Sequence, residues 1–360
     1  MELRVAVAGC GKVADMHAEE IQKMPGIARI VAAYDLELLM AEQLSSRYNI
    51  PKYYDDMDKM LSIDRPDVVH ITTPPHSHLS LATKALDAGC HVYVEKPFTM
   101  NYDEAVKLIE HALQAERKLT IGYTFLLDPP ALAMREILAN DLLGEPIHVE
   151  SFYSYDLGSS YGTALLSDSN HWVHRLPGKL FHNNLDHLLS KITEFIDDDQ
   201  PEIAAFSTRR RQSHLGDVRD DMHDELRLLI RGERTTAYGT FSAHTSPGLH
   251  FCRVYGTKNT IHVDYAARTV TFERVPREPT KIGQFLPAFE QAVQFTRQGM
   301  HNMLQFVRGD FHPGSGLNRL IKAYYRSILD DKPPPVAYRD ILRISAMLDE
   351  IWRQTVREQP

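Results

Sequence analysis

The residue best placed to do chemistry is Lys96, which stands between a glutamate and a proline. Residues 91–94 (HVYV) form a short apolar run typical of a buried strand, and Glu95-Lys96-Pro97 follows it directly. Ligands of a parallel sheet bind outside the carboxyl ends of its strands, so Lys96 is expected at the edge where a site would form. There its ammonium can hold or protonate a substrate oxygen. The alternative is a solvated lysine at a strand end.

A second motif lies near the start of the chain, where a strand-like run at residues 3–8 leads into GCGKVA at residues 9–14. This G-x-G-x-x-A spacing before a helical pattern is typical of a dinucleotide-binding turn. Gly9 permits the tight turn, Gly11 lets a pyrophosphate approach the backbone, and Ala14 allows the helix to pack closely on the strand. The helix N-terminus supplies amide donors to the phosphates.

A carboxylate follows the second predicted strand, at residues 30–34. Asp35 lies 21 residues after Ala14, where a carboxylate accepts hydrogen bonds from an adenosine ribose. The same charge repels the 2′-phosphate of NADP, so the sequence favours NAD. The alternative is a turn or capping aspartate.

Strand and helix patterns alternate with short connections over the first 122 residues, which predicts a doubly wound parallel sheet. The loop TPPHSH at residues 73–78 follows the buried strand 68–72. Its two prolines make it rigid, and its position at a strand end suits the wall of a cofactor pocket.

Composition limits the class of protein. The chain has 360 residues, enough for two domains, and its net charge of -8 argues against a nucleic-acid partner. Three cysteines, an odd number, suit reduced thiols in a cytoplasmic protein. No signal peptide and no apolar run long enough for a membrane span is expected.

With the G-x-G-x-x-A turn, the loop at 73–78 and Glu95-Lys96-Pro97 in this order, the sequence resembles the Gfo/Idh/MocA oxidoreductases, the group of glucose–fructose oxidoreductase and inositol dehydrogenase. The resemblance implies an α/β protein with an N-terminal Rossmann domain at residues 1–122. A C-terminal α+β domain at residues 123–360 would carry a large, mostly antiparallel sheet that forms a homodimer or homotetramer. The closing helix at 338–357 is a candidate to pack back on the first domain.

The resemblance also assigns roles by position. Thr73, Pro74 and His78 would line the nicotinamide side, Glu95 would support the cofactor, and Lys96 would touch the reacting oxygen. The expected cofactor contacts are Gly9, Gly11, Lys12, Val13, Ala14, Asp35, Thr73, Pro74, His78, Glu95 and Lys96.

Residues 171–187 contain the other candidate chemistry, because from residue 180 to residue 196 the leucines and isoleucines have the spacing of one amphipathic helix. Related sequences tend to carry an aspartate and, four residues later, a histidine in this helix. Here His182 and Asp186 occupy those places in inverted order. The expected substrate contacts are Lys96, Tyr123, His171, Trp172, His182, Asn183, Asp186 and His187.

Three interpretations of the inverted pair stay open. His182 could be the general base with Asp186 as its partner, since residues four apart share a helical face. The pair could instead abstract a proton beside a carbonyl, or be structural or substrate-binding only. A metal site at these histidines is less favoured, because dinucleotide chemistry requires no metal.

Beyond residue 202 the pattern predicts six further strands, at 203–207, 224–230, 235–242, 251–256, 259–264 and 269–273. Residues 275–290, with three prolines, are expected to form a long loop, and helix-like spacing begins at residue 285. The leading hypothesis is an NAD-dependent oxidoreductase that moves a hydride between nicotinamide and a carbinol carbon of a sugar or cyclitol. The alternatives are a redox-neutral glycoside-cleaving enzyme with tightly bound NAD and a non-catalytic NAD-binding regulator.

Overall fold

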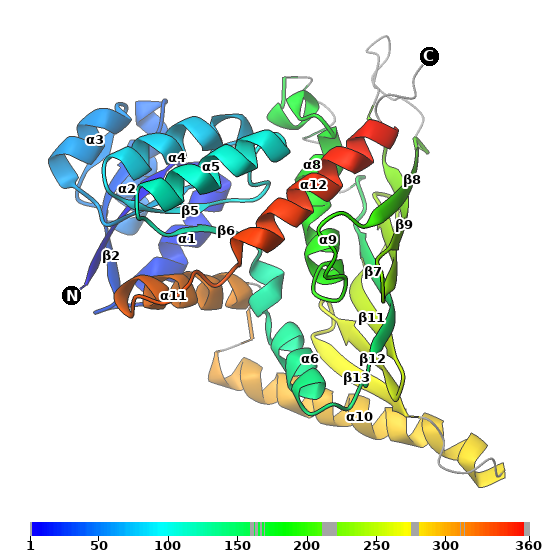
Figure 1. Cartoon of the computed structure of the whole chain (residues 1–360). Helices are drawn as coiled ribbons and strands as arrows, with labels where there is room; N and C mark the ends of the chain where they lie inside the picture. The colour runs from blue at the N-terminus through cyan, green and yellow to red at the C-terminus, as the bar shows by residue number, and fades with distance from the viewer. Residues whose placement is uncertain are drawn as a thin grey trace. The chain divides into compact units, whose positions relative to one another are not determined.

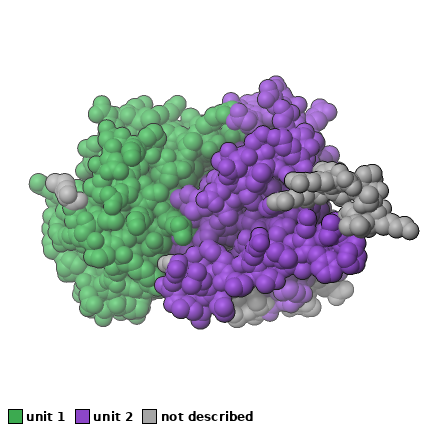
Figure 2. Space-filling model, turned by 90° about the horizontal axis from the view of Figure 1, so that it is seen from below, with its two compact units in different colours: residues 1–124, 316–346 green, residues 125–315, 347–360 purple. Residues whose placement is uncertain are grey.

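The computed structural model describes residues 2–158, 162, 165, 168, 170–210, 222–274, 281–309, 311–312 and 314–355. The chain divides into two compact units, coloured separately in Figure 2. Unit 1 comprises Met1–Thr124 and Gly316–Ala346, and unit 2 comprises Phe125–Ser315 and Met347–Pro360. Among the described residues, no helix combines the length and apolar character needed to cross a membrane.

Unit 1 is built on a six-stranded parallel sheet in the order β3-β2-β1-β4-β5-β6. Its strands are β1 (Leu3–Ala8), β2 (Ala28–Tyr34), β3 (Tyr53–Tyr54), β4 (Val68–Ile71), β5 (His91–Val94) and β6 (Leu119–Ile121). Its helices are α1 (Lys12–Gln22), α2 (Leu38–Tyr48), α3 (Met57–Asp64), α4 (His78–Asp87), α5 (Tyr102–Gln114) and most of α11 (Ser315–Leu329). The strand order reverses direction between β1 and β4, which is where ligands bind in doubly wound sheets. The predicted Rossmann architecture is confirmed.

Unit 2 is built on a seven-stranded sheet in the order β13-β12-β11-β7-β10-β9-β8 (Figure 1). Among the described strands of this sheet, only the pair of β7 and β10 is parallel. The other pairs are antiparallel. The strands are β7 (Pro146–Ser154), β8 (Glu202–Thr208), β9 (Glu225–Arg231), β10 (Thr236–Ser242), β11 (His250–Gly256), β12 (Asn259–Asp264) and β13 (Thr269–Arg274). All six strands predicted beyond residue 202 are present, and the large, mostly antiparallel sheet is confirmed.

The helices that unit 2 contributes are α6 (Pro129–Ala139), α8 (Lys179–Asn184), α9 (Asp186–Ile192), α10 (Lys281–Arg308) and the second half of α12 (Tyr338–Thr355). Helix α9 packs on one face of this sheet, and α10 lies along its edge strand β13. The Ser151 hydroxyl on β7 donates to the Leu188 carbonyl of α9 at 3.1 Å. A Cβ added to Gly239 of β10 would lie 2.7 Å from the Leu188 side chain, so a glycine is needed where α9 approaches.

Two elements differ from the prediction. The single helix expected from residue 180 to 196 is two short helices, α8 and α9, with Leu185 between them. The prediction of a loop at 275–290 is wrong from residue 281 onward, because α10 begins there and includes Pro287. Residues 275–280 lie outside the described part of the chain.

A lysine lies in the core of unit 2. Lys191, on α9, is 2% exposed, and its Nζ contacts the His187 carbonyl and lies 2.6 Å from His250 Nε2. The rings of Phe125 and Tyr265 lie 5.6 Å and 5.1 Å from the same nitrogen. Burial lowers the pKa of Lys191 to about 7, because an apolar surrounding disfavours the charged form.

This buried lysine should make the stability of the protein depend on pH. Below pH 7 the folded and unfolded states both carry the proton, and the folded state bears the full cost of burying the charge. Above pH 7 the folded state loses the proton, whereas the unfolded lysine keeps it up to about its ordinary pKa of 10.5. The free energy of unfolding should therefore rise by about 2 kcal/mol between roughly pH 6.5 and 8.5.

Thermal or urea unfolding across this pH range measures the effect, and Lys191→Met should flatten the rise. The matched control is Lys258→Met, which removes a lysine of the same unit whose side chain is 54% exposed. Equal slopes in wild type and Lys191→Met would show that Lys191 does not titrate in this window.

Candidate functional site

The candidate cofactor site is the edge of the parallel sheet where β1, β4 and β5 end. At this edge Gly9 has φ +96, and a Cβ there would lie 2.8 Å from the Thr73 backbone nitrogen. The Thr72 hydroxyl donates to the Gly9 carbonyl at 2.6 Å. The turn after β1 is thus packed directly on the loop after β4, and only glycine fits at position 9.

The next glycine has a different environment. Gly11 caps α1 with φ -77, and no atom lies within 4 Å of the position that its Cβ would take. No side chain caps the helix. Of the first-turn amides, that of Ala14 donates to the Gly11 carbonyl at 3.0 Å, and those of Lys12 and Val13 come before the first intrahelical acceptor. Ala14, fully buried, lets α1 lie close to the sheet, while Lys12 and Val13 are exposed. This open, donor-rich helix end fits a pyrophosphate.

Asp35 follows β2 and braces the same turn. Its Oδ2 accepts a hydrogen bond from the Cys10 amide at 2.6 Å, and its Oδ1 accepts one from the Glu37 amide at 3.0 Å. Each carboxylate oxygen can accept more than one hydrogen bond, so Asp35 can also receive ribose hydroxyl donors. Burial, and then the charge of Asp35, raises the pKa of the Cys10 thiol to about 12, which leaves it unreactive.

The loop after β4 is held from inside the protein. Its Ser77 hydroxyl donates to the Thr73 hydroxyl oxygen at 2.7 Å. His78 is fully buried, with Nε2 2.7 Å from the Thr73 carbonyl and Nδ1 3.1 Å from the Phe98 carbonyl. Burial lowers the pKa of His78, so the neutral ring donates to one of these carbonyls. The imidazole thus lies between the two loops and is hydrogen-bonded to one of them, and Thr73 and Pro74, both half-buried, form the loop surface.

Glu95 and Lys96 follow β5. The Glu95 carboxylate accepts a hydrogen bond from the Lys96 amide at 3.1 Å and lies 2.9 Å from His17 Nε2. The Lys96–Pro97 peptide bond is cis. A Cβ on Gly122, the residue after β6, would lie 2.7 Å from Glu95 Oε1, so the backbone of that residue also confines the carboxylate.

The residues expected to contact substrate are distributed over both units. Lys96 and Tyr123 belong to unit 1, and the others (His171, Trp172, His182, Asn183, Asp186 and His187) belong to unit 2. His182 and Asp186 are each 1% exposed and lie on successive helices, α8 and α9.

The ring of His182 stacks on Trp352 at 5.6 Å, so an aromatic contact fixes its plane. His171 stacks on Trp172 at 5.5 Å. The described residues contain no group of three or more histidine, cysteine, aspartate or glutamate side chains that could hold a metal ion.

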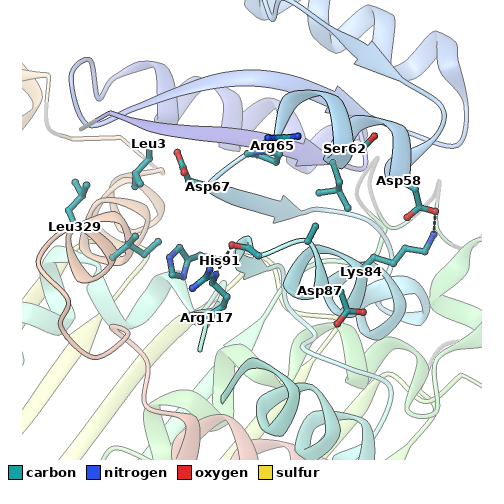
Figure 3. A pocket seen from close by; sticks show the side chains of 15 residues that line it. Leu3, Asp58, Ser62, Arg65, Asp67, Lys84, Asp87, His91, Arg117 and Leu329 are labelled. Carbon is teal, nitrogen blue, oxygen red and sulfur yellow. Dashed lines mark hydrogen bonds and ion pairs between the residues drawn. The ribbon is translucent and has the colours of Figure 1, made fainter. Parts of the chain in front are cut away.

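A cavity of about 1120 Å³ in unit 1 is not this site. Leu3, Asp67 and His91, which line it, stand where β1, β4 and β5 begin, at the edge opposite the glycine turn (Figure 3). An ion pair joins Lys84 and Asp58 across it at 2.7 Å. The cavity therefore lies at the opposite end of the strands from the residues that fit a dinucleotide.

Sequence reasoning missed three residues behind Glu95. His17 on α1, His70 on β4 and Tyr325 on α11 are all fully buried. A histidine inside the apolar run VVHI was the one signal that could have pointed to them, because a polar residue in a buried strand needs a partner.

Known proteins resemble the first part of this chain in sequence. Residues 3–123 match a family described as an oxidoreductase family with an NAD-binding Rossmann fold. D-glucoside 3-dehydrogenase of Escherichia coli (strain K12) is 34% identical over 145 residues, which is 40% of this chain and 41% of that protein. Inositol 2-dehydrogenase of Rubrobacter xylanophilus is 33% identical over 147 residues, 40% and 42% of the two chains. The chain thus spans about two fifths of the length of these curated relatives.

The fold match extends further than the sequence match. The crystal structure of the WlbA dehydrogenase from Bordetella pertussis in complex with NADH and UDP-GlcNAcA superposes with a TM-score of 0.76 at 15% identity. The match covers 98% of this chain and 95% of that one. Fold and glycine turn define an NAD-binding Rossmann domain in unit 1, of the kind described for that oxidoreductase family. Residues 3–123 of this chain are similar to the Gfo/Idh/MocA oxidoreductases, and the rest of the chain shares their fold.

Proposed function

We propose that the protein is an NAD-dependent dehydrogenase that oxidises a carbinol carbon of a sugar, cyclitol or sugar derivative. The observation that carries the proposal is the placement of Lys96 after β5, at the same sheet edge as the glycine turn after β1. Relatives named for glucosides and inositol support the substrate class.

The chain's own residues have distinct roles in this proposal. Gly11 and the α1 amides would hold the pyrophosphate, and Asp35 the adenosine ribose. Bound NAD would supply the hydride acceptor. The Lys96 ammonium would stabilise negative charge on the substrate oxygen as its proton leaves, an electrostatic effect worth several kcal/mol in such sites. His182 and Asp186 are the proposed second group for handling that proton.

Replacement of Lys96 tests the function directly. Lys96→Ala should keep its NAD affinity and lose at least about 100-fold in turnover, because it removes a contact made to the developing charge. Purified protein is screened with NAD against sugars, cyclitols and glycosides, following nicotinamide absorbance and substrate loss in parallel. The matched control is Lys84→Ala, which removes a lysine of α4 that lines the cavity at the opposite edge of the sheet.

The outcomes separate the rival functions. NADH formed in step with substrate loss supports the dehydrogenase, and unchanged turnover in Lys96→Ala would remove Lys96 from its mechanism. Substrate loss without NADH would favour redox-neutral glycoside cleavage. NAD binding with neither signal would favour a regulatory protein.

The preference for NAD over NADP depends in this proposal on Asp35. Asp35→Ala should bind NAD roughly tenfold more weakly, the scale of lost hydrogen bonds to a charged group, and NADP relatively better. Titration calorimetry with both dinucleotides measures the ratio. Glu37→Ala, the carboxylate two residues on, is the control. A ratio unchanged in Asp35→Ala would refute the ribose assignment.

We further propose a homo-oligomer formed through the unit 2 sheet, in the cytoplasm, where the buried free thiols stay reduced. On the face turned away from α9, Phe206, Leu229 and Tyr238 are 71%, 48% and 52% exposed. Register places Leu229 opposite Tyr238 on neighbouring strands, so the apolar side chains are contiguous, as interfaces require.

Light scattering should give a dimer or tetramer mass for the wild type and a smaller mass for Tyr238→Glu. A wild-type monomer at micromolar concentration would contradict this assembly.

A further inference from the structure

A chain of hydrogen bonds runs through the interior of unit 1 behind Glu95. Glu95 Oε1 lies 2.9 Å from His17 Nε2, and His17 Nδ1 lies 2.8 Å from His70 Nδ1. His70 Nε2 lies 2.8 Å from the Tyr325 hydroxyl. These four residues, here called the histidine network, come from α1, β4, α11 and the end of β5 (Figure 1). Both histidines and the tyrosine have no exposed surface.

One arrangement of protons satisfies every member. The Tyr325 hydroxyl donates to His70 Nε2, which makes His70 a donor at Nδ1. His17 then accepts at Nδ1 and donates from Nε2 to the Glu95 carboxylate. Both rings are neutral, as different tautomers, and every donor points toward the negative charge.

A positively charged His17 would satisfy fewer of the hydrogen bonds in the network. A protonated His17 would turn its Nδ1 into a donor and force His70 to donate to the Tyr325 oxygen. Among the described residues Tyr325 has no second hydrogen-bond acceptor, so its own proton would be buried without a partner, at a cost of about 1–3 kcal/mol. Burial, and then the proximity of His17, also lowers the pKa of His70 well below its ordinary value.

Neighbouring groups lock this arrangement. The ring of Tyr93 stacks on His70 at 4.7 Å with an interplanar angle of 4°, and meets His17 edge-on at 5.0 Å. The other Glu95 oxygen accepts from the Lys96 amide, and Gly122 closes a further side of the carboxylate. The Glu95 side chain is 12% exposed. The carboxylate is therefore held on both oxygens, one of them by the backbone of Lys96.

We propose that His17, His70 and Tyr325 are positioning residues that hold Glu95 as an oriented carboxylate and thereby fix the backbone of Lys96 at the reacting edge. The network ends at Tyr325, inside the protein, so it positions charge and does not conduct protons to solvent. The effect on turnover rests on the function proposed above; the proton arrangement itself does not.

Adjacent tyrosines on α11 offer a matched pair of variants. Tyr325→Phe removes only the terminal donor of the network. Tyr324→Phe removes an equally buried hydroxyl, which donates to the Val92 and Lys118 carbonyls, outside the network. The Tyr324 ring, which lies 6.2 Å from that of Tyr325, is kept as a phenyl ring. A third variant, His70→Asn, keeps an amide donor near His17 Nδ1 and loses the contact with Tyr325.

The first measurement is nitrogen-15 NMR of the imidazoles in the full-length protein, with His17 and His70 assigned by their substitution. The expected result is two neutral rings, protonated at Nε2 in His17 and at Nδ1 in His70. Tyr325→Phe should change the His70 signals, and Tyr324→Phe should not. Two identical tautomers, a charged ring, or an equal response to the two phenylalanine variants would overturn the proposal.

The second measurement is turnover with the substrate found by the screen. Tyr325→Phe should lower kcat by about fivefold, the scale of one buried hydrogen bond, with KM and NAD affinity within twofold of wild type. His70→Asn should retain more activity than His70→Phe. Equal kcat in Tyr325→Phe and Tyr324→Phe would refute the positioning role. If the screen finds no substrate, the function proposed above fails while the NMR result still decides the network.

Discussion

The contact between Gly9 and Thr73 sets the geometry on which the candidate cofactor site depends. With a Cβ position only 2.8 Å from the Thr73 amide, the turn after β1 rests directly on the backbone after β4. The strand order reverses between these two strands, so the two loops would otherwise diverge and leave an open crevice. Gly11, two residues on, has no atom within 4 Å of the position that its Cβ would take, so the backbone there stays accessible.

The interior of unit 1 must also satisfy polar groups that this packing buries. His78 does so between the loops after β4 and β5, and the histidine network does so beneath Glu95. In a low-dielectric interior an unpaired polar group costs several times what a satisfied one gains. These buried contacts therefore fix the surface loops more firmly than hydrogen bonds exposed to water could.

The sequence predicted the strands of both sheets and the glycine turn, because each depends on local periodicity or on a short motif. Local patterns could not predict hydrogen bonds between residues far apart in the sequence. His17 and His70 lie 53 residues apart, and His70 and Tyr325 lie 255 apart. The helix break at Leu185 was not predicted for another reason. It keeps a helical backbone and an apolar side chain where α8 gives way to α9, so the periodicity continues across the break.

The separation of His182 and Asp186 onto two helices follows from the same break. A continuous helix would have placed His182 and Asp186 on one face by spacing alone. Instead His182 lies in the last turn of α8 with its ring stacked on Trp352, and Asp186 is the first residue of α9. The plane of the imidazole is thus set by an indole from the end of the chain. Spacing no longer argues for a His182–Asp186 unit, and the proposed chemistry depends chiefly on Lys96, whose backbone the Glu95 carboxylate holds in place.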